Sequence, residues 1–272
     1  MKYKLLITLL CVTVGFNAFS QSFPAEFMAG LKQIQSADKA GAKANFLLAV
    51  NKAPTFFGSY HFLGDICQGD NKLDSAAWYF KKSIELNTNN LNHTKELTYA
   101  RLVNNYVYQH DFKGGFDVAW DALKQFPESN NIKAALKDLC LWAFYIKYDK
   151  LDPSYLGMEL KEEYLVNSIP QEYLIVRRIK VDGETPVVTG QSVGTKNKAT
   201  YDMLTCNIPP QKKTITVNFK LNWDLTKDFG GKIPATAPVI GDTKKPVYER
   251  LGAMLIADDK VDVKAAIEKM TM

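Results

Sequence analysis

Residues 57–90 read FGSYHFLGDICQGDNKLDSAAWYFKKSIELNTNN, and this stretch predicts a pair of helices. Leu63 and Gly64 fall on one face of the first helix, and Ala76 and Phe80 fall on one face of the second. Gly and Ala are small where two antiparallel helices approach closely, and the large side chains fill the space between them. The stretch therefore predicts a helical hairpin.

The same pattern occurs 34 residues earlier in the chain. Gly30, Ala42 and Phe46 stand one period before the corresponding glycine, alanine and phenylalanine. A third unit fits residues 96–129, after an insertion of about five residues, and an apolar helical pattern follows over residues 131–148. A period of 34 residues is typical of stacked helical hairpins.

This repeat resembles the tetratricopeptide repeat (TPR) over residues 23–150, because each window keeps about five of the eight signature positions of that family. Residues 73–75 (Leu-Asp-Ser) predict the turn and the N-cap of the second helix. The resemblance implies a stack of hairpins whose first helices line a groove for a protein or peptide partner. The alternative is an unrelated helical bundle with chance periodicity.

The resemblance also implies which side chains line this groove. Chaperone-binding members of the family grip a terminal carboxylate with Lys, Arg and Asn, but here only Asn104 fits and no Lys or Arg is expected in the groove, so that activity is not predicted. An extended segment, a partner helix or the C-terminal region of the same chain remain as occupants. The predicted groove residues are Phe27, Leu31, His61, Asp65, Gln68, Asn104, Tyr108 and Trp142.

The N-terminus has the pattern of a secretory signal peptide. Lys2 and Lys4 precede an apolar stretch over residues 5–16, and small residues predict cleavage after Ser20. Lipidation at Cys11 is the alternative, although the residues before it do not fit a lipoprotein signal. The sequence therefore predicts an exported protein, periplasmic or secreted, with a bacterial envelope as the favoured location.

Charge and hydropathy exclude two kinds of partner. The chain has 34 Lys and Arg against 29 Asp and Glu, a net charge of +5. Removing residues 1–20 removes two lysines, which leaves 32 minus 29, or +3. This charge is too small for a nucleic-acid interface, and no later apolar segment is long enough to span a membrane. The expected partner is a protein or peptide, such as an envelope assembly.

The cysteines predict neither a disulfide framework nor a metal site. Cys67, Cys140 and Cys206 are far apart in the sequence, and no CxxC pair occurs. Cys67 and Cys140 fall in apolar helical patterns, so buried thiols are expected. Pairing of two of them in an oxidising compartment is the alternative.

After Pro170, which is expected to close the helical array, the pattern changes to strands. The region before it, residues 155–166, is expected to extend the array. A β-branched run, two shorter runs and one clear alternation of apolar and polar residues predict strands, with a turn at Asp182-Gly183. The predicted strands are residues 172–181, 185–189, 201–208 and 214–223.

Residues 226–246 are rich in Gly and Pro and predict an irregular segment, followed by short helices at 247–256 and 261–270. The predicted fold class is α+β: an all-α TPR-like helical-hairpin array, then a small antiparallel β-rich domain with C-terminal helices. The predicted domains are a signal peptide (1–20), the repeat domain (21–168) and the β-rich domain (169–272). The β-rich domain resembles no known family.

Motifs for catalysis fail in context. Gly190–Gly194 matches the GxSxG pattern of α/β hydrolases at Ser192, but all three histidines (His61, His93, His110) precede it and no helix follows. The segment is therefore expected to be a loop between strands. Asp258, Asp259 and Asp262 fit a solvated helix start better than a cation site. No catalytic residue, metal or cofactor is predicted.

The favoured function is thus an exported, non-enzymatic scaffold or adaptor that acts through protein–protein interaction. The alternative is a ligand-binding or hydrolytic protein that uses the β-rich domain or its junction with the repeats. A hydrolase would need a base within hydrogen-bond reach of Ser192.

Overall fold

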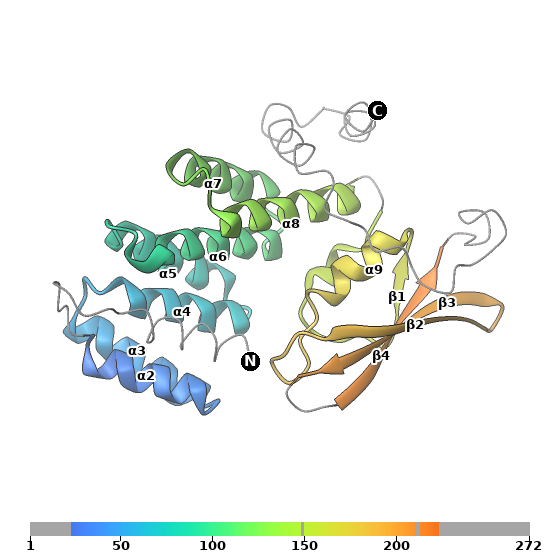
Figure 1. Ribbon diagram of the computed structural model, residues 1–272, viewed down its shortest axis with the longest axis horizontal. Helices are drawn as coiled ribbons and strands as arrows, with labels where there is room; N and C mark the ends of the chain where they lie inside the picture. Colours follow the sequence, from blue (N-terminus) through green and yellow to red (C-terminus); the bar gives the residue numbers. More distant parts are fainter. Residues whose placement is uncertain (1–22, 148–149, 210–212, 223–272) are drawn as a thin grey trace. The chain divides into compact units, whose positions relative to one another are not determined.

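The computed structural model describes residues 23–147, 150–209 and 213–222 (Figure 1). The chain divides into two compact units between Leu139 and Cys140. The fold is α+β, as predicted: helices are followed by a four-stranded sheet. The expected signal peptide, Trp223, the irregular segment 226–246 and the C-terminal helices lie outside the described residues.

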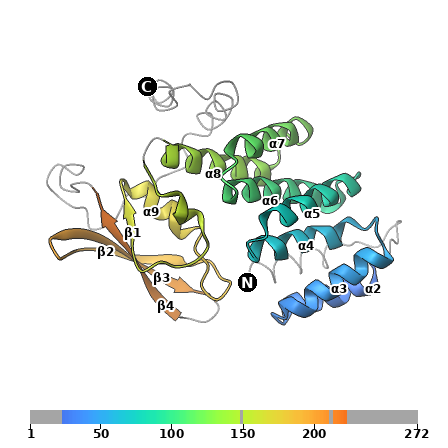
Figure 2. The ribbon, with the colours of Figure 1, turned by 180° about the vertical axis from the view of Figure 1, so that it is seen from behind.

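The first unit is built from consecutive helices that pair along the chain (Figures 1 and 2). Each of the first three pairs is joined by a turn of three residues, and α8 crosses the boundary between the units. The helices are α2 (Ala25–Gln35), α3 (Lys39–Lys52), α4 (Phe57–Gly69), α5 (Leu73–Leu86), the 3-10 helix η1 (Leu91–His93), α6 (Thr94–Tyr108), α7 (Phe112–Gln125) and α8 (Asn130–Lys147).

The turns within the three helix pairs have the same backbone geometry. Ala37, Asn71 and His110 adopt left-handed φ angles of 62°, 56° and 60°. In each turn, the N–H of the next residue donates to a carbonyl five residues earlier, which closes the end of the first helix. Positions 37 and 71 are one period apart, and position 110 follows after the period plus the insertion. The three hairpins therefore repeat in conformation as well as in sequence.

The second helices begin differently. Asp38 and Asp111 each accept a hydrogen bond from the backbone N–H three residues later and so cap α3 and α7. The N-cap of α5 is Lys72, which makes no such bond. The N-cap predicted within residues 73–75 is wrong, because α5 already begins at Leu73 and places Asp74 inside its first turn.

Close packing of paired helices explains the small residues of the repeat. A Cβ atom added to Gly30 would lie 2.5 Å from the ring of Phe46, and one added to Gly64 would lie 2.5 Å from the ring of Phe80. Both phenylalanines are fully buried. In each of these two hairpins the glycine of the first helix thus makes room for the aromatic ring of the second helix, and the two contacts are one period of 34 residues apart.

The second unit contains a mixed sheet with strand order β1-β4-β3-β2. β1 pairs with β4 in parallel, whereas the other neighbours are antiparallel, so the prediction of a purely antiparallel sheet is wrong. Figures 1 and 2 show α9 beside the sheet. The elements are η2 (Pro153–Leu156), β1 (Tyr164–Val166), α9 (Ile169–Val176), β2 (Val187–Lys196), β3 (Ala199–Ile208) and β4 (Lys213–Leu221).

The strand predicted at residues 172–181 is wrong, because this run begins inside α9. Ser168 precedes the helix, and Pro170 lies in its first turn, where the fixed φ of proline favours a helix. Pro170 therefore opens a helix rather than closing one. Leu174, Ile175 and Val176 are all buried, and a short apolar run that is buried on every side has no periodicity to separate helix from strand.

Other predictions for this unit meet mixed outcomes. The strand at 201–208 is confirmed as β3, the strand at 214–223 is confirmed up to Leu221 as β4, and Asp182-Gly183 forms the expected turn with φ angles of 51° and 82°. Residues 155–166 do not extend the helical array but contain η2 and β1. β2 is longer than the predicted strand at 185–189, and it includes the predicted loop 190–194.

Cys67, Cys140 and Cys206 are free and buried, as expected. In the described part of the chain, no helix combines the length and the hydropathy needed to cross a membrane.

Candidate functional site

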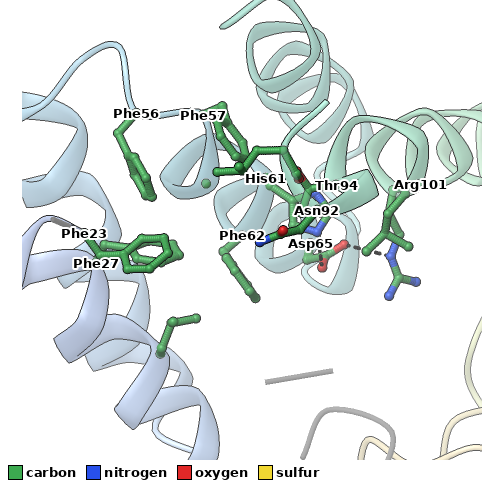
Figure 3. A pocket seen from close by; sticks show the side chains of 14 residues that line it. Phe23, Phe27, Phe56, Phe57, His61, Phe62, Asp65, Asn92, Thr94 and Arg101 are labelled. Atoms are coloured by element: carbon green, nitrogen blue, oxygen red, sulfur yellow. Dashed lines mark hydrogen bonds and ion pairs between the residues drawn. The ribbon is translucent and has the colours of Figure 1, made fainter. Parts of the chain in front are cut away.

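An aromatic pocket lies in the first unit between α2, α4 and the start of α6 (Figure 3). These are the first helices of the three hairpins, so the pocket lies on the side where the groove was predicted. It encloses about 60 Å³. Its apolar lining is Phe23, Phe27, Leu31, Phe56, Phe57, Gly58, Phe62, Leu91 and Leu97, and its polar lining is His61, Asp65, Asn92, Thr94 and Arg101.

The polar lining includes a charged pair beside a buried histidine. Arg101 Nε lies 3.4 Å from Asp65 Oδ1, and His61 Nε2 lies 3.6 Å from Asp65 Oδ2 (Figure 3). His61 Nδ1 lies 2.9 Å from the hydroxyl of Thr98 on α6. Burial lowers the pKa of His61 despite the opposing effect of Asp65, so the imidazole is neutral at neutral pH. The pocket thus combines aromatic walls with a polar end.

The insertion between the second and third hairpins forms one wall of the pocket. Asn90, Asn92 and His93 have left-handed φ angles of 46°, 51° and 58°. The side chains of Asn87 and Asn90 hold this segment: Asn90 Nδ2 donates to Glu96 Oε1 over 2.7 Å, and Asn87 Oδ1 accepts a backbone N–H over 3.2 Å. Left-handed backbone conformations of residues other than glycine persist only where the surrounding structure fixes them, and they are concentrated at ligand sites.

Four of the predicted groove residues meet in the pocket: Phe27 and Leu31 from α2, and His61 and Asp65 from α4. Gln68, one turn further along α4, is buried and donates from Nε2 to Asn105 Oδ1 over 3.3 Å, so it joins α4 to α6.

The other predicted groove residues lie elsewhere. Asn104 and Tyr108 are half-buried on α6, one turn apart, and do not line the pocket. Trp142 belongs to the second unit and is fully buried, with the guanidinium of Arg178 over its ring at 5.5 Å from the ring centroid. Its burial leaves no surface for a partner.

Sequence reasoning missed part of the pocket. Phe56, Phe57 and Phe62 lie within seven residues of one another, and this aromatic density was a signal that could have identified them. The expectation that no Lys or Arg lies in the groove is wrong, because Arg101 lines the pocket. Arg101 holds in α6 the position that Phe62 holds in α4, and neither position was among the predicted groove residues.

A pair of buried carboxyl groups lies in the second unit. Glu172 on α9 is fully buried, and Asp202 on β3 is 1% exposed. Burial, with the neighbouring Asp202 carboxylate, raises the pKa of Glu172 to about 10, and burial also raises the pKa of Asp202. Gln191 Nε2 donates to Asp202 Oδ2, and the Tyr173 hydroxyl donates to Gln191 Oε1 over 3.2 Å. At neutral pH the pair therefore holds a proton on Glu172.

The sequence carried a signal for the burial of Asp202, although not for its partner. Asp202 alternates with Leu204 and Cys206 and so falls on the buried face of its strand, where a lone carboxylate is costly.

The second unit also has a polar hollow of about 310 Å³. Glu163 accepts a hydrogen bond from the Tyr201 hydroxyl over 3.0 Å at its edge. Ser192 is outside this hollow; it is exposed within β2, opposite Met203, and not on a sharp turn. The lining residues are Glu162, Glu163, Gly194, Thr195, Lys196, Tyr201, Met203 and Asn218.

Within residues 23–147, 150–209 and 213–222, no three His, Cys, Asp or Glu side chains are grouped to hold a metal ion. Comparison with protein-family models finds no match for this chain, and comparison with curated proteins finds none. The function proposed below is therefore argued from the pocket.

Proposed function

We propose that this chain is an exported, non-enzymatic adaptor of the tetratricopeptide-repeat type that binds a segment of a partner protein in the groove of its first helices. The observation that carries the proposal is the aromatic pocket between α2, α4 and α6, where four predicted groove residues meet. The repeated turns at Ala37, Asn71 and His110 support the repeat assignment. The charged and apolar pattern of residues 1–20 supports export.

The composition of the pocket supports a protein partner. Aromatic anchors in pockets with a few polar groups are typical of the centres of protein interfaces. The pocket has a volume of only about 60 Å³, which suits one projecting side chain better than a whole cofactor. The insertion between the second and third hairpins is held by the side chains of Asn87 and Asn90, so this wall of the pocket has a fixed shape before binding. A fixed shape reduces the conformational entropy lost on association.

We expect Leu91→Glu to weaken partner binding by about tenfold or more, because it places a charge at the apolar wall of the pocket. Leu91 is 43% exposed, so the fold should tolerate the change. The measurement is capture of partners from the native envelope fraction by the tagged mature protein, followed by titration of the purified partner against both proteins.

Leu48→Glu is the matched control. Leu48 is also 43% exposed, but it lies on α3, a second helix, and does not line the pocket. The proposal requires a partner that is lost with Leu91→Glu and kept with Leu48→Glu, while circular dichroism shows both variants folded. Equal binding by both variants would overturn it.

Ligand binding by the second unit is the other candidate function. The polar hollow favours it, because the side chains of Glu163, Lys196 and Asn218 could orient a small hydroxylated or amino ligand. Thermal-shift screening of such ligands against the parent protein and Glu163→Gln tests this candidate, which requires a stabilising ligand whose effect the variant loses.

A further inference from the structure

The proton on the imidazole of His61 can be located from its neighbours. The Thr98 hydroxyl oxygen lies 2.8 Å from the Thr94 carbonyl oxygen, which can only accept, so the single hydroxyl proton lies between them. Thr98 Oγ1 therefore accepts from His61 Nδ1–H over 2.9 Å. In the neutral ring Nδ1 carries the proton, and Nε2 is a hydrogen-bond acceptor.

This acceptor lies beside a second one. His61 Nε2 is 3.6 Å from Asp65 Oδ2, which is longer than the roughly 2.7–2.9 Å of a charged N–H···O bond. One donor group at the polar end of the pocket can reach both atoms. Arg101 already faces the other oxygen of Asp65, at 3.4 Å, so the charge of Asp65 is matched and a neutral donor suits the site better than a second cation.

The size of the pocket limits what can bring this donor. A dry cavity of ~150 Å³ encloses a benzene ring, and this pocket, which is partly open to solvent, has a volume of about 60 Å³. It therefore admits the leading end of an aromatic ring while the rest of the ring stays in the groove. The hydroxyl of a phenol is at that leading end, whereas the N–H of an indole is on the side of the ring.

We propose that the pocket receives a tyrosine side chain of the partner segment, with its hydroxyl donating to His61 Nε2, beside Asp65 Oδ2. The ring then lies among Phe27, Phe57 and Phe62, whose side chains surround the same space (Figure 3). This inference rests on the proposed function, because it specifies the side chain that anchors the partner.

The test compares three blocked amino acids as ligands of the mature protein: N-acetyl-tyrosinamide, its O-methyl derivative and N-acetyl-phenylalaninamide. Nuclear magnetic resonance titration follows the signals of the pocket residues. We expect tyrosinamide to bind about tenfold more tightly than the other two, because only it offers a donor to the two acceptors. Equal binding of tyrosinamide and its O-methyl derivative would overturn the tyrosine assignment.

The Thr98→Val variant tests whether the preference for tyrosinamide depends on the position of the proton on the His61 imidazole. Without the hydroxyl acceptor, His61 should move its proton to Nε2, which then no longer accepts from the tyrosine hydroxyl, so the preference for tyrosinamide over its O-methyl derivative should fall from about tenfold to about threefold or less. Thr216→Val, at an exposed site in β4, is the control and should keep the preference.

Proton–nitrogen correlation spectra report the tautomer directly. The parent protein should show His61 protonated at Nδ1, and a proton at Nε2 instead would overturn the inference even if Thr98→Val fails to fold. Failure of this inference leaves the proposed function standing if Leu91→Glu still abolishes partner binding and Leu48→Glu does not. If both leucine variants bind the partner alike, it is the proposed function that fails.

Discussion

Replacing Glu172 by glutamine should stabilise the second unit by about 2–3 kcal/mol at neutral pH. Burial and the Asp202 carboxylate raise the pKa of Glu172 to about 10 in the folded protein, against an ordinary value of 4.5. Folding at pH 7 therefore requires an ionised glutamate to take up a proton. A glutamine keeps the shape and can donate to Asp202 without that uptake, so the cost disappears.

The same shift fixes the sign of the pH dependence. The folded state binds one more proton than the unfolded state between pH 4.5 and about 10, so the free energy of unfolding falls as pH rises through this range. The slope is about 1.4 kcal/mol per pH unit. The raised pKa of Asp202 acts in the same direction above its ordinary value.

Urea unfolding at pH 5, 7 and 9 measures both effects. The Glu172→Gln protein should lose most of the slope, whereas Glu159→Gln, at an exposed site in the same unit, should keep it. A Glu172→Gln protein that is less stable than its parent at pH 7 would contradict this prediction.

The second large effect concerns the helix contact at Gly64. Gly64→Ala should destabilise the first unit by about 1–3 kcal/mol, because the new Cβ would lie 2.5 Å from the ring of Phe80, which is fully buried and cannot move away. Thermal unfolding followed by circular dichroism at the helix band measures the loss.

Two variants test the cause. Gly69→Ala, at the end of the same helix, meets only Lys39 Nζ at 3.5 Å and should be neutral or stabilising by up to about 1 kcal/mol. Adding Phe80→Leu to Gly64→Ala should cost less than the sum of the single changes, because the smaller side chain makes room for the methyl group. Additive losses would mean that the two positions do not contact each other.

The hairpins could be predicted because the 34-residue spacing and the pairing of small with large residues agree. Gly64 and Phe80 recur at the same spacing as Gly30 and Phe46, and only helices that touch at these positions require small and large residues in that order. The sheet was harder. Leu174, Ile175 and Val176 are consecutive and all buried, so their pattern fits strand or helix, and Pro170 fits either the end of the array or the first turn of a new helix.

The sequence predicted some of the pocket residues that follow the repeat frame but none of those in the insertion. His61 and Asp65 fall at groove positions in the repeat frame, which is a local property of α4. Leu91 reaches the pocket from the insertion with its left-handed residues, and a repeat frame carries no information on how an insertion folds. The Glu172–Asp202 pair depends on a contact between a helix and a strand thirty residues apart, which periodicity does not report.

The buried thiols have a practical consequence for experiments on this protein. Burial raises the pKa of Cys140 to about 12 and that of Cys206 to about 11, and it also raises the pKa of Cys67. The thiolate is the form that reacts with oxidants and alkylating reagents, so these residues react only when the surrounding structure opens. Cys67 lies in the first unit, and Cys140 and Cys206 lie in the second. Their labelling rates, read separately by mass spectrometry, therefore give each unit its own native reporter of breathing motions, with no introduced label.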